Sequence, residues 1–171
     1  MREVASDAPR RLDSTLAAGS EYHPVAVLRL DVGRLEPVQN AHGSGAAERV
    51  LEIVGQRVAC AIRAEDTVLR LKSGGFACLL VDMPTREQLS HVACKVLDAV
   101  SEPIEVDSLQ ITVCPSIGIA MCPADGRSAE DLLKTADGAM YRARAQNSGY
   151  AFCDARAQVW ASHSPELACR S

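Results

Sequence analysis

The chain has 171 residues, of which 47% are hydrophobic and 23% are charged, shares that exclude a disordered or fibrous chain and suit one globular domain. A formal net charge of -4 argues against a surface that binds nucleic acid through its phosphates. No stretch approaches the roughly 20 apolar residues of a membrane span, and the first residues lack a secretory pattern. We therefore expect a cytoplasmic protein without membrane insertion of this chain.

The cysteines show neither a Cys-x-x-Cys pair nor a Cys/His spacing typical of metal ligands. Most of them lie within apolar stretches. We interpret them as small core side chains in a reducing compartment, and we predict neither a zinc site nor a disulfide framework. The cysteines are Cys60, Cys78, Cys94, Cys114, Cys122, Cys153 and Cys169.

The two ends of the chain carry little pattern. Residues 1–23 show weak periodicity and are interpreted as a linker or short helix. Residues 154–171 are interpreted as a tail or linker. The domain is therefore expected at 24–153.

The first half of this domain alternates between strand and helix patterns. Val25–Val32 is nearly all apolar and rich in β-branched residues, as in a strand that is buried on both faces. An apolar stripe with a period of about 3.6 residues then predicts a helix over 47–62. A hairpin is predicted over 67–82, and the same helical spacing predicts a second helix over 89–100.

The second half opens with a predicted hairpin that turns at Asp107-Ser108 and whose long second strand runs to about Met121. Because proline cannot donate to a ladder, this strand is expected to be an edge strand or to be bulged near Pro115. A third helix is predicted to begin at Ser128, which has an acid three residues later. A short last strand is predicted at 150–153.

This order of elements mixes hairpins with helical crossovers, which predicts an α+β fold with helices packed on a mostly antiparallel sheet. Two stretches make the fold more specific. "SIGIAMCPADG" is similar to SIGIALYPEDG, and "LLKTADGAMYRARAQ" is similar to LLRRADxAMYRAKxxG, both of the GGDEF domain. From about Val25 to Phe152 the chain resembles this family of diguanylate cyclases, which join two GTP molecules into cyclic di-GMP. Class III nucleotide cyclases share the topology but lack these stretches.

The resemblance implies a ferredoxin-like palm, with a five-stranded sheet flanked by helices, but the turn that names the family departs from its pattern. The Gly-Gly-Asp-Glu-Phe turn reads Lys72-Ser73-Gly74-Gly75-Phe76 in this chain. Gly75 stands where the family has a metal-ligating Glu, and Lys72 and Ser73 carry side chains where the family's glycines leave room for GTP. If the glycines are kept for backbone reasons, Gly74 or Gly75 should have a positive φ.

The resemblance also implies a set of acids that holds Mg²⁺ in the family, and this chain keeps only one of them. Asp31 remains, while Gly33 occupies the second acidic position of the strand end. One carboxylate cannot organise two hard cations, so no metal, no cofactor and no catalytic residue are predicted. The alternative for Asp31 is a strand-terminal acid that bonds to nearby amides.

The substrate pocket implied by the resemblance is altered too. Gln39 and Glu48 stand where the family reads guanine with Asn and Asp, and each is one methylene longer. Arg144 keeps a cation of the family, whereas Ser148 replaces a phosphate-contacting Arg. Weak GTP binding stays open, and so does the alternative that Gln39 and Glu48 lie on a solvated helix face.

One ligand motif of the family is intact. "RAED", from Arg63 to Asp66, lies five residues before the altered turn, at the offset of the RxxD site where the family binds cyclic di-GMP. Arg can donate two parallel hydrogen bonds to guanine, and Asp can accept from its N1-H and amino group without a metal. The alternative is that Asp66 caps or begins the strand.

The favoured hypothesis is a catalytically inactive GGDEF-like regulatory module in cyclic di-GMP signalling. It binds cyclic di-GMP at Arg63 and Asp66, or it docks a partner or an adjacent domain. An EAL phosphodiesterase domain or a sensory domain is expected in the full-length protein. The alternatives are a structural dimerisation or docking domain without nucleotide, and a cyclase with residual activity.

Overall fold

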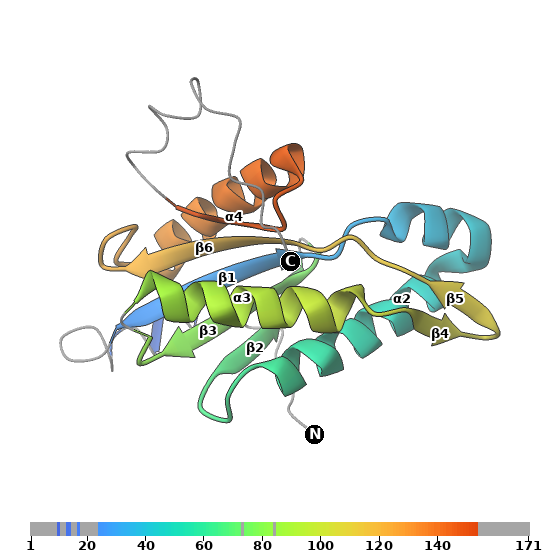
Figure 1. Cartoon of the computed structure of the whole chain (residues 1–171), viewed down its shortest axis with the longest axis horizontal. Helices are drawn as coiled ribbons and strands as arrows, with labels where there is room; N and C mark the ends of the chain where they lie inside the picture. The colour runs from blue at the N-terminus through green and yellow to red at the C-terminus, as the bar shows by residue number, and fades with distance from the viewer. Residues whose placement is uncertain are drawn as a thin grey trace.

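The computed structural model describes residues 10, 13, 14, 17, 24–72, 74–83 and 85–153. Within them it has a five-stranded sheet and a separate two-stranded sheet, packed with helices (Figure 1). The strands are β1 Val25–Asp31, β2 Thr67–Arg70, β3 Phe76–Val81, β4 Ile104–Val106, β5 Leu109–Ile111, β6 Ser116–Cys122 and β7 Tyr150–Phe152. The helices are α2 Leu35–Ala61, α3 Arg86–Ser101 and α4 Ala129–Gln146.

The five-stranded sheet has the order β2-β3-β1-β6-β7. All neighbouring strands are antiparallel except β6 and β7, which are parallel. The predicted mostly antiparallel sheet is thereby confirmed. The central strand β1 pairs Leu30 with Phe76 of β3 and Asp31 with Ser116 of β6. The end of β1 therefore lies beside the turn that joins β2 to β3.

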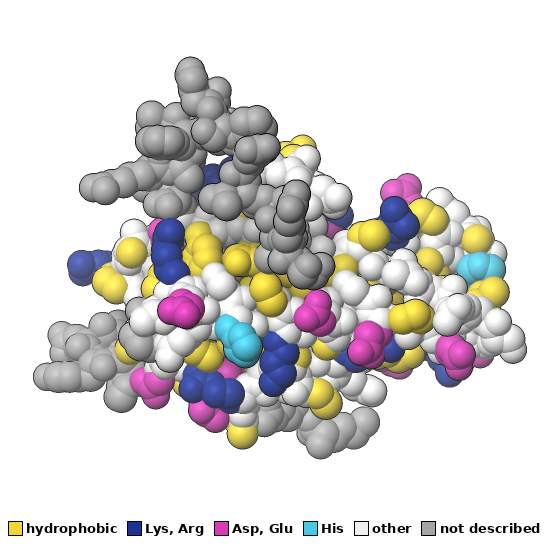
Figure 2. Space-filling view, viewed as in Figure 1, with side chains coloured by type: hydrophobic (Ala, Val, Ile, Leu, Met, Phe, Trp, Pro, Cys, Tyr) yellow, Lys and Arg dark blue, Asp and Glu magenta, His cyan; other side chains and the backbone are white. Residues whose placement is uncertain are grey.

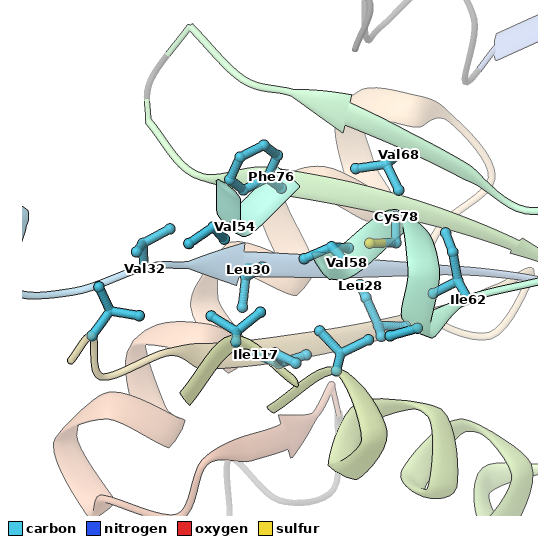
Figure 3. Packing of buried hydrophobic residues seen from close by; sticks show 14 of the residues in the cluster. Leu28, Leu30, Val32, Val54, Val58, Ile62, Val68, Phe76, Cys78 and Ile117 are labelled. Carbon is cyan, nitrogen blue, oxygen red and sulfur yellow. The ribbon is translucent and has the colours of Figure 1, made fainter. Parts of the chain in front are cut away.

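The sheet has a different helical layer on each face (Figure 1). Leu28 and Leu30 of β1 belong to the cluster that α2 and α3 cover, and Figure 3 shows them with Val54 and Val58 of α2. Val27 belongs to a second cluster, which α4 covers. Because side chains alternate along a strand, the odd-numbered residues of β1 face α4.

Helix α2 begins well before the predicted stripe at 47–62. It starts at Leu35 and is broken at Gly43, where φ is 85° and ψ is 169°. The periodicity missed the first segment because Val38 is its buried residue, while most of its other side chains are exposed. The break allows two helical directions within α2.

The hairpin turn at Asp107-Ser108 is confirmed, with φ values of 47° and 69° that are typical of a tight two-residue hairpin turn. The prediction of a single long strand after this turn is wrong. Residues 112–115 are not in a strand, so the run is divided into β5 in the small sheet and β6 in the large one. The edge position expected from Pro115 is wrong as well, because β6 lies between β1 and β7. Since Pro115 has no N–H to donate, the chain leaves one ladder before it enters the next.

The predicted start of the third helix is confirmed, because the Ser128 hydroxyl accepts from the backbone N–H of Asp131 at 3.1 Å. Interpreting the cysteines as core side chains is right for Cys78 and Cys122, which are buried, and wrong for Cys60 and Cys114, which are exposed. Burial raises the pKa of the Cys78 thiol to about 12.

The boundaries of the domain stay a prediction. Most of 1–23, all of 154–171 and Ser73 lie outside the described residues. None of the helices in the described part of the chain combines the length and apolar character that a membrane span needs. On the face shown in Figure 2, side chains of both charges are interspersed around α3.

Candidate functional site

The residues singled out around the altered turn meet at one end of the sheet. Asp31 ends β1, and its Oδ2 forms an ion pair with Nη2 of Arg144, which lies in the last turn of α4. Gly75 approaches the same end of β1 from the turn between β2 and β3. The Ser148 hydroxyl is used within the chain, because it donates to the carbonyl of Tyr150 at 3.2 Å. The structure thus brings Asp31, Gly75 and Arg144 together.

The two glycines of the turn both have positive φ, 96° at Gly74 and 74° at Gly75, which confirms the backbone prediction. They differ in surroundings. A Cβ at Gly74 would meet nothing within 4 Å, whereas one at Gly75 would lie 2.2 Å from the carbonyl oxygen of Leu30. A side chain at Gly75 therefore cannot be added without moving the central strand.

Gly33 has the same restriction on the other side of Asp31. Its φ is 63°, and a Cβ there would lie 2.4 Å from the carbonyl oxygen of Cys114. Backbone atoms cannot yield as the end of a flexible side chain can. The resemblance implies lost acids at Gly33, Gly74 and Gly75, and of these Gly33 and Gly75 are closed to side chains while Gly74 is open.

These residues do not fit the pair of divalent cations that the family implies. Hard cations need several oxygen ligands, and Asp31, the one carboxylate kept at the positions that the resemblance implies, is paired with Arg144. No cluster of three His, Cys, Asp or Glu side chains suited to a metal occurs among the described residues. Lys72 is exposed beside the turn.

Arg29 of β1 is a member of this site that the sequence reasoning missed. It is only 6% exposed, its Nη1 donates to the carbonyl of Leu30 at 2.7 Å, and its Nε lies 3.5 Å from Oδ1 of Asp137. Burial lowers the pKa of the Arg29 guanidinium, and the charges of Asp137 and Asp31 act in the opposite direction. The available signal was a lone cation in an otherwise apolar stretch of strand.

Gln39 and Glu48, which the resemblance places where the family reads guanine, are both exposed on α2, on opposite sides of the break at Gly43. Glu48 forms an ion pair within the chain. Its Oε2 accepts from Nη2 of Arg70 at 2.7 Å, and Oε1 accepts from Nη1 of the same guanidinium. The hydrogen bond from Arg70 lowers the pKa of Glu48.

A cleft of about 500 Å³ lies between the first segment of α2 and the region of β5. Asp31, Gln39, Glu48, Gly75 and Arg144 are not among its lining residues. Its lining residues are Arg34, Pro37, Val38, His42, Gln110, Ile111 and Thr112.

The RxxD residues form a corner where α2 ends and β2 begins. The Asp66 side chain is 0% exposed, and its oxygens accept from the N–H of Arg63 at 3.0 Å, from Arg63 Nε at 3.3 Å and from the N–H of Val81 at 3.2 Å. The Arg63 side chain is 39% exposed, also donates to the Val81 carbonyl, and approaches Glu65 at 3.4 Å. In this geometry Asp66 lies directly before β2 and bonds to backbone groups, which agrees with the alternative interpretation of this residue. Part of the Arg63 side chain still faces solvent.

The five-stranded palm, with the altered turn at the end of its central strand, defines a nucleotide-cyclase type of fold. The chain matches the family described as "Diguanylate cyclase, GGDEF domain" over residues 8–149, and it belongs to that family. This confirms the resemblance seen in the two motif stretches.

Among curated proteins, the chain is 31% identical over 143 residues to the bifunctional diguanylate cyclase/cyclic di-GMP phosphodiesterase MucR of Pseudomonas aeruginosa. That match covers 83% of this chain but 21% of MucR. The chain is also 30% identical over 141 residues to the diguanylate cyclase TpbB of the same species, which covers 81% of this chain and 32% of TpbB. The chain thus spans about a fifth to a third of these relatives.

Solved structures share the fold, and two of them illustrate the similarity. An EAL/GGDEF domain protein from M. capsulatus superposes with a TM-score of 0.75 at 35% identity, over 82% of this chain and 92% of that one. The GGDEF domain of TpbB from P. aeruginosa superposes with a TM-score of 0.82 at 27% identity, over 90% of this chain and 99% of that one.

Proposed function

We propose that this chain is a catalytically inactive GGDEF domain that serves as a regulatory module in cyclic di-GMP signalling. The observation that carries the proposal is the closure of positions 33 and 75. A Cβ at either would lie within 2.4 Å of a backbone carbonyl oxygen, so neither position can supply the carboxylate that the reaction needs. Asp31 is left alone and is neutralised by Arg144.

The chemistry explains why this loss matters. Attack of a ribose hydroxyl on an α-phosphate requires metal ions that lower the pKa of the nucleophile and absorb the developing charge. Such ions need several oxygen ligands in a fixed arrangement. A single carboxylate in an ion pair supplies neither the number of ligands nor the arrangement.

A turnover assay tests this part of the proposal. The full chain is incubated with GTP and Mg²⁺ or Mn²⁺, and pyrophosphate and cyclic di-GMP are measured beside the diguanylate cyclase TpbB as the comparison. We expect no product above the protein-free control. Product formed at a rate similar to TpbB, and lost in Asp31→Asn, would overturn the proposal.

The same assay on Gly75→Glu is expected to show no product either. A Glu at this position would collide with the Leu30 carbonyl and with Arg29 Nη1, which lies 2.6 Å from the Cβ position. Activity depends on positioning within fractions of an ångström, so a displaced carboxylate gives little catalysis. Robust turnover in this single variant would show that the turn alone decides activity.

The proposed ligand is cyclic di-GMP, bound at the corner of Arg63 and Asp66 and not in the altered catalytic site. Recognition at this corner needs a guanidinium fork and no metal, and the Arg63 side chain is 39% exposed. In this arrangement Asp66 holds the guanidinium through Nε, and the exposed part of the Arg63 side chain contacts the O6 and N7 edge of guanine. Glu65, which lies 3.4 Å from Nη1, has to move aside when guanine binds.

Calorimetry with cyclic di-GMP tests the ligand. A bidentate contact to guanine is worth about 1–3 kcal/mol, so Arg63→Ala should weaken binding by about tenfold or more. Asp31→Ala is the matched control and should bind like the unchanged chain. Absence of heat at high micromolar cyclic di-GMP would leave a docking module without nucleotide as the function.

A further inference from the structure

The buried Arg29 owes its place to two small neighbours in the sheet. It lies opposite Ala77 of β3 and Gly118 of β6, which leave space for a long side chain on the face toward α4. A Cβ at Gly118 would lie 1.8 Å from the carbonyl of Ala136, so α4 crosses β6 directly at this point. The next helical residue, Asp137, is thereby brought to 3.5 Å from Arg29 Nε.

The guanidinium of Arg29 lies directly against the altered turn. Its Nη1 donates to the carbonyl of Leu30 at 2.7 Å and lies 2.6 Å from the Cβ position of Gly75. Gly75 is the position where the resemblance places a metal-ligating carboxylate. The absence of a side chain at Gly75 and the presence of the guanidinium are therefore two aspects of one packing arrangement.

Two ion pairs lie around this point. Arg29 and Arg144 are the cations, and Asp137 and Asp31 are the carboxylates that pair with them. Burial acts to discharge Arg29, and both carboxylates act to keep it charged. A divalent cation near Asp31 would be repelled by a guanidinium that is only partly screened by water.

We infer that Arg29 is an internal cation that takes the place of the family's metal ions, pairing with Asp137 beside the Asp31–Arg144 pair and excluding divalent cations from this end of the sheet. The inference rests on the proposed function in one respect, which is that this end of the sheet corresponds to the family's catalytic site. Metal binding and turnover are measured separately, so one can fail while the other stands.

The test uses Mn²⁺ as the probe and electron paramagnetic resonance of free Mn²⁺ as the readout, on the full chain. The unchanged chain and Asp31→Asn are expected to bind Mn²⁺ equally weakly, because Asp31 is not available. Arg29→Met is expected to bind Mn²⁺ about tenfold more tightly, since removal of a nearby positive charge lowers the repulsion of a dication. The double variant with Asp31→Asn should lose this gain.

Arg49→Met is the matched control, because it changes the net charge equally and Arg49 pairs with Asp107 on the exposed surface. Two results would overturn the inference: Mn²⁺ binding by the unchanged chain that Asp31→Asn removes, or binding by Arg29→Met no tighter than by Arg49→Met. Circular dichroism checks the fold of each variant. If Arg29→Met does not fold, the comparison of the unchanged chain with Asp31→Asn decides the question alone.

Discussion

Two regions of this GGDEF domain differ in how their residues relate to the family's motifs. At the turn end, formed by Arg29, Asp31, Gly75 and Arg144, Asp31 is the one acid kept from the family's pattern, and backbone packing closes position 75. At the Arg63 corner, formed by Arg63, Asp66 and Val81, the motif residues are present, but Asp66 bonds within the chain.

The comparison shows that a motif match depends on two separate properties. One is the type of each residue, and the other is whether its side chain is free to contact a ligand. At the turn end the residue types differ from the family's pattern, and the proposed loss of catalysis rests on that difference. At the Arg63 corner the residue types are kept, and the buried carboxylate of Asp66 is used to join the end of α2 to the strands. A motif match therefore predicts a ligand only where the side chain still faces solvent, as part of Arg63 does.

The largest expected effect is at the turn end. Gly75→Val should lower the free energy of unfolding by about 3 kcal/mol or more, because a positive φ and a carbonyl at 2.2 Å both oppose a side chain. Gly74→Ala is the control and should cost about 1 kcal/mol, since it meets the positive φ but open space. Urea unfolding measures both. Equal losses would mean that the contact with Leu30 is not limiting.

The Arg63 corner should show the next largest effect. Asp66→Ala removes the acceptor of two backbone N–H groups, those of Arg63 and Val81, and should cost about 2–4 kcal/mol. The control is Glu65→Ala, at an exposed neighbouring residue, which should change the free energy of unfolding by less than about 1 kcal/mol. If the two variants unfold alike, Asp66 does not hold the corner, and its carboxylate is free for a ligand.

A smaller effect is expected on ligand affinity at the same corner. Arg63→Lys keeps the positive charge but removes the fork that donates two parallel hydrogen bonds. We expect it to weaken cyclic di-GMP binding by about tenfold, close to the loss in Arg63→Ala. Titration calorimetry measures the affinity of both variants. If the positive charge alone contributed to binding, Arg63→Lys would retain most of the affinity.

The smallest effect is expected at the exposed pair of Glu48 and Arg70. Glu48→Gln should cost less than about 1 kcal/mol, because water screens an exposed ion pair. The hydrogen bond from Arg70 lowers the folded-state pKa of Glu48 below its ordinary value of 4.5. The pair therefore stabilises the fold above pH 4.5, and this contribution is lost as the pH falls through the lowered pKa. Unfolding of Glu48→Gln compared with the unchanged chain at pH 7 and at low pH checks the sign.

The local patterns of the sequence determined most of the secondary structure and the family. Hydrophobic periodicity placed β1, α3 and both strands of the first hairpin, and the cap at Ser128 placed the start of α4. These signals depend on neighbours a few residues away, which the sequence contains directly. The stretches SIGIAMCPADG and LLKTADGAMYRARAQ determined the family in the same way.

The tertiary structure decided what depends on segments far apart in the chain. The division of the predicted long strand at Pro115 depends on which sheet each half joins, and the closure of Gly33 depends on the carbonyl of Cys114. Arg29 became part of the site because α4 crosses β6 at Gly118. Asp66 became unavailable because the N–H of Val81 in β3 lies beside it. Residue type is written in the sequence, but the partners of a side chain are set by packing between elements, and no local pattern encodes them.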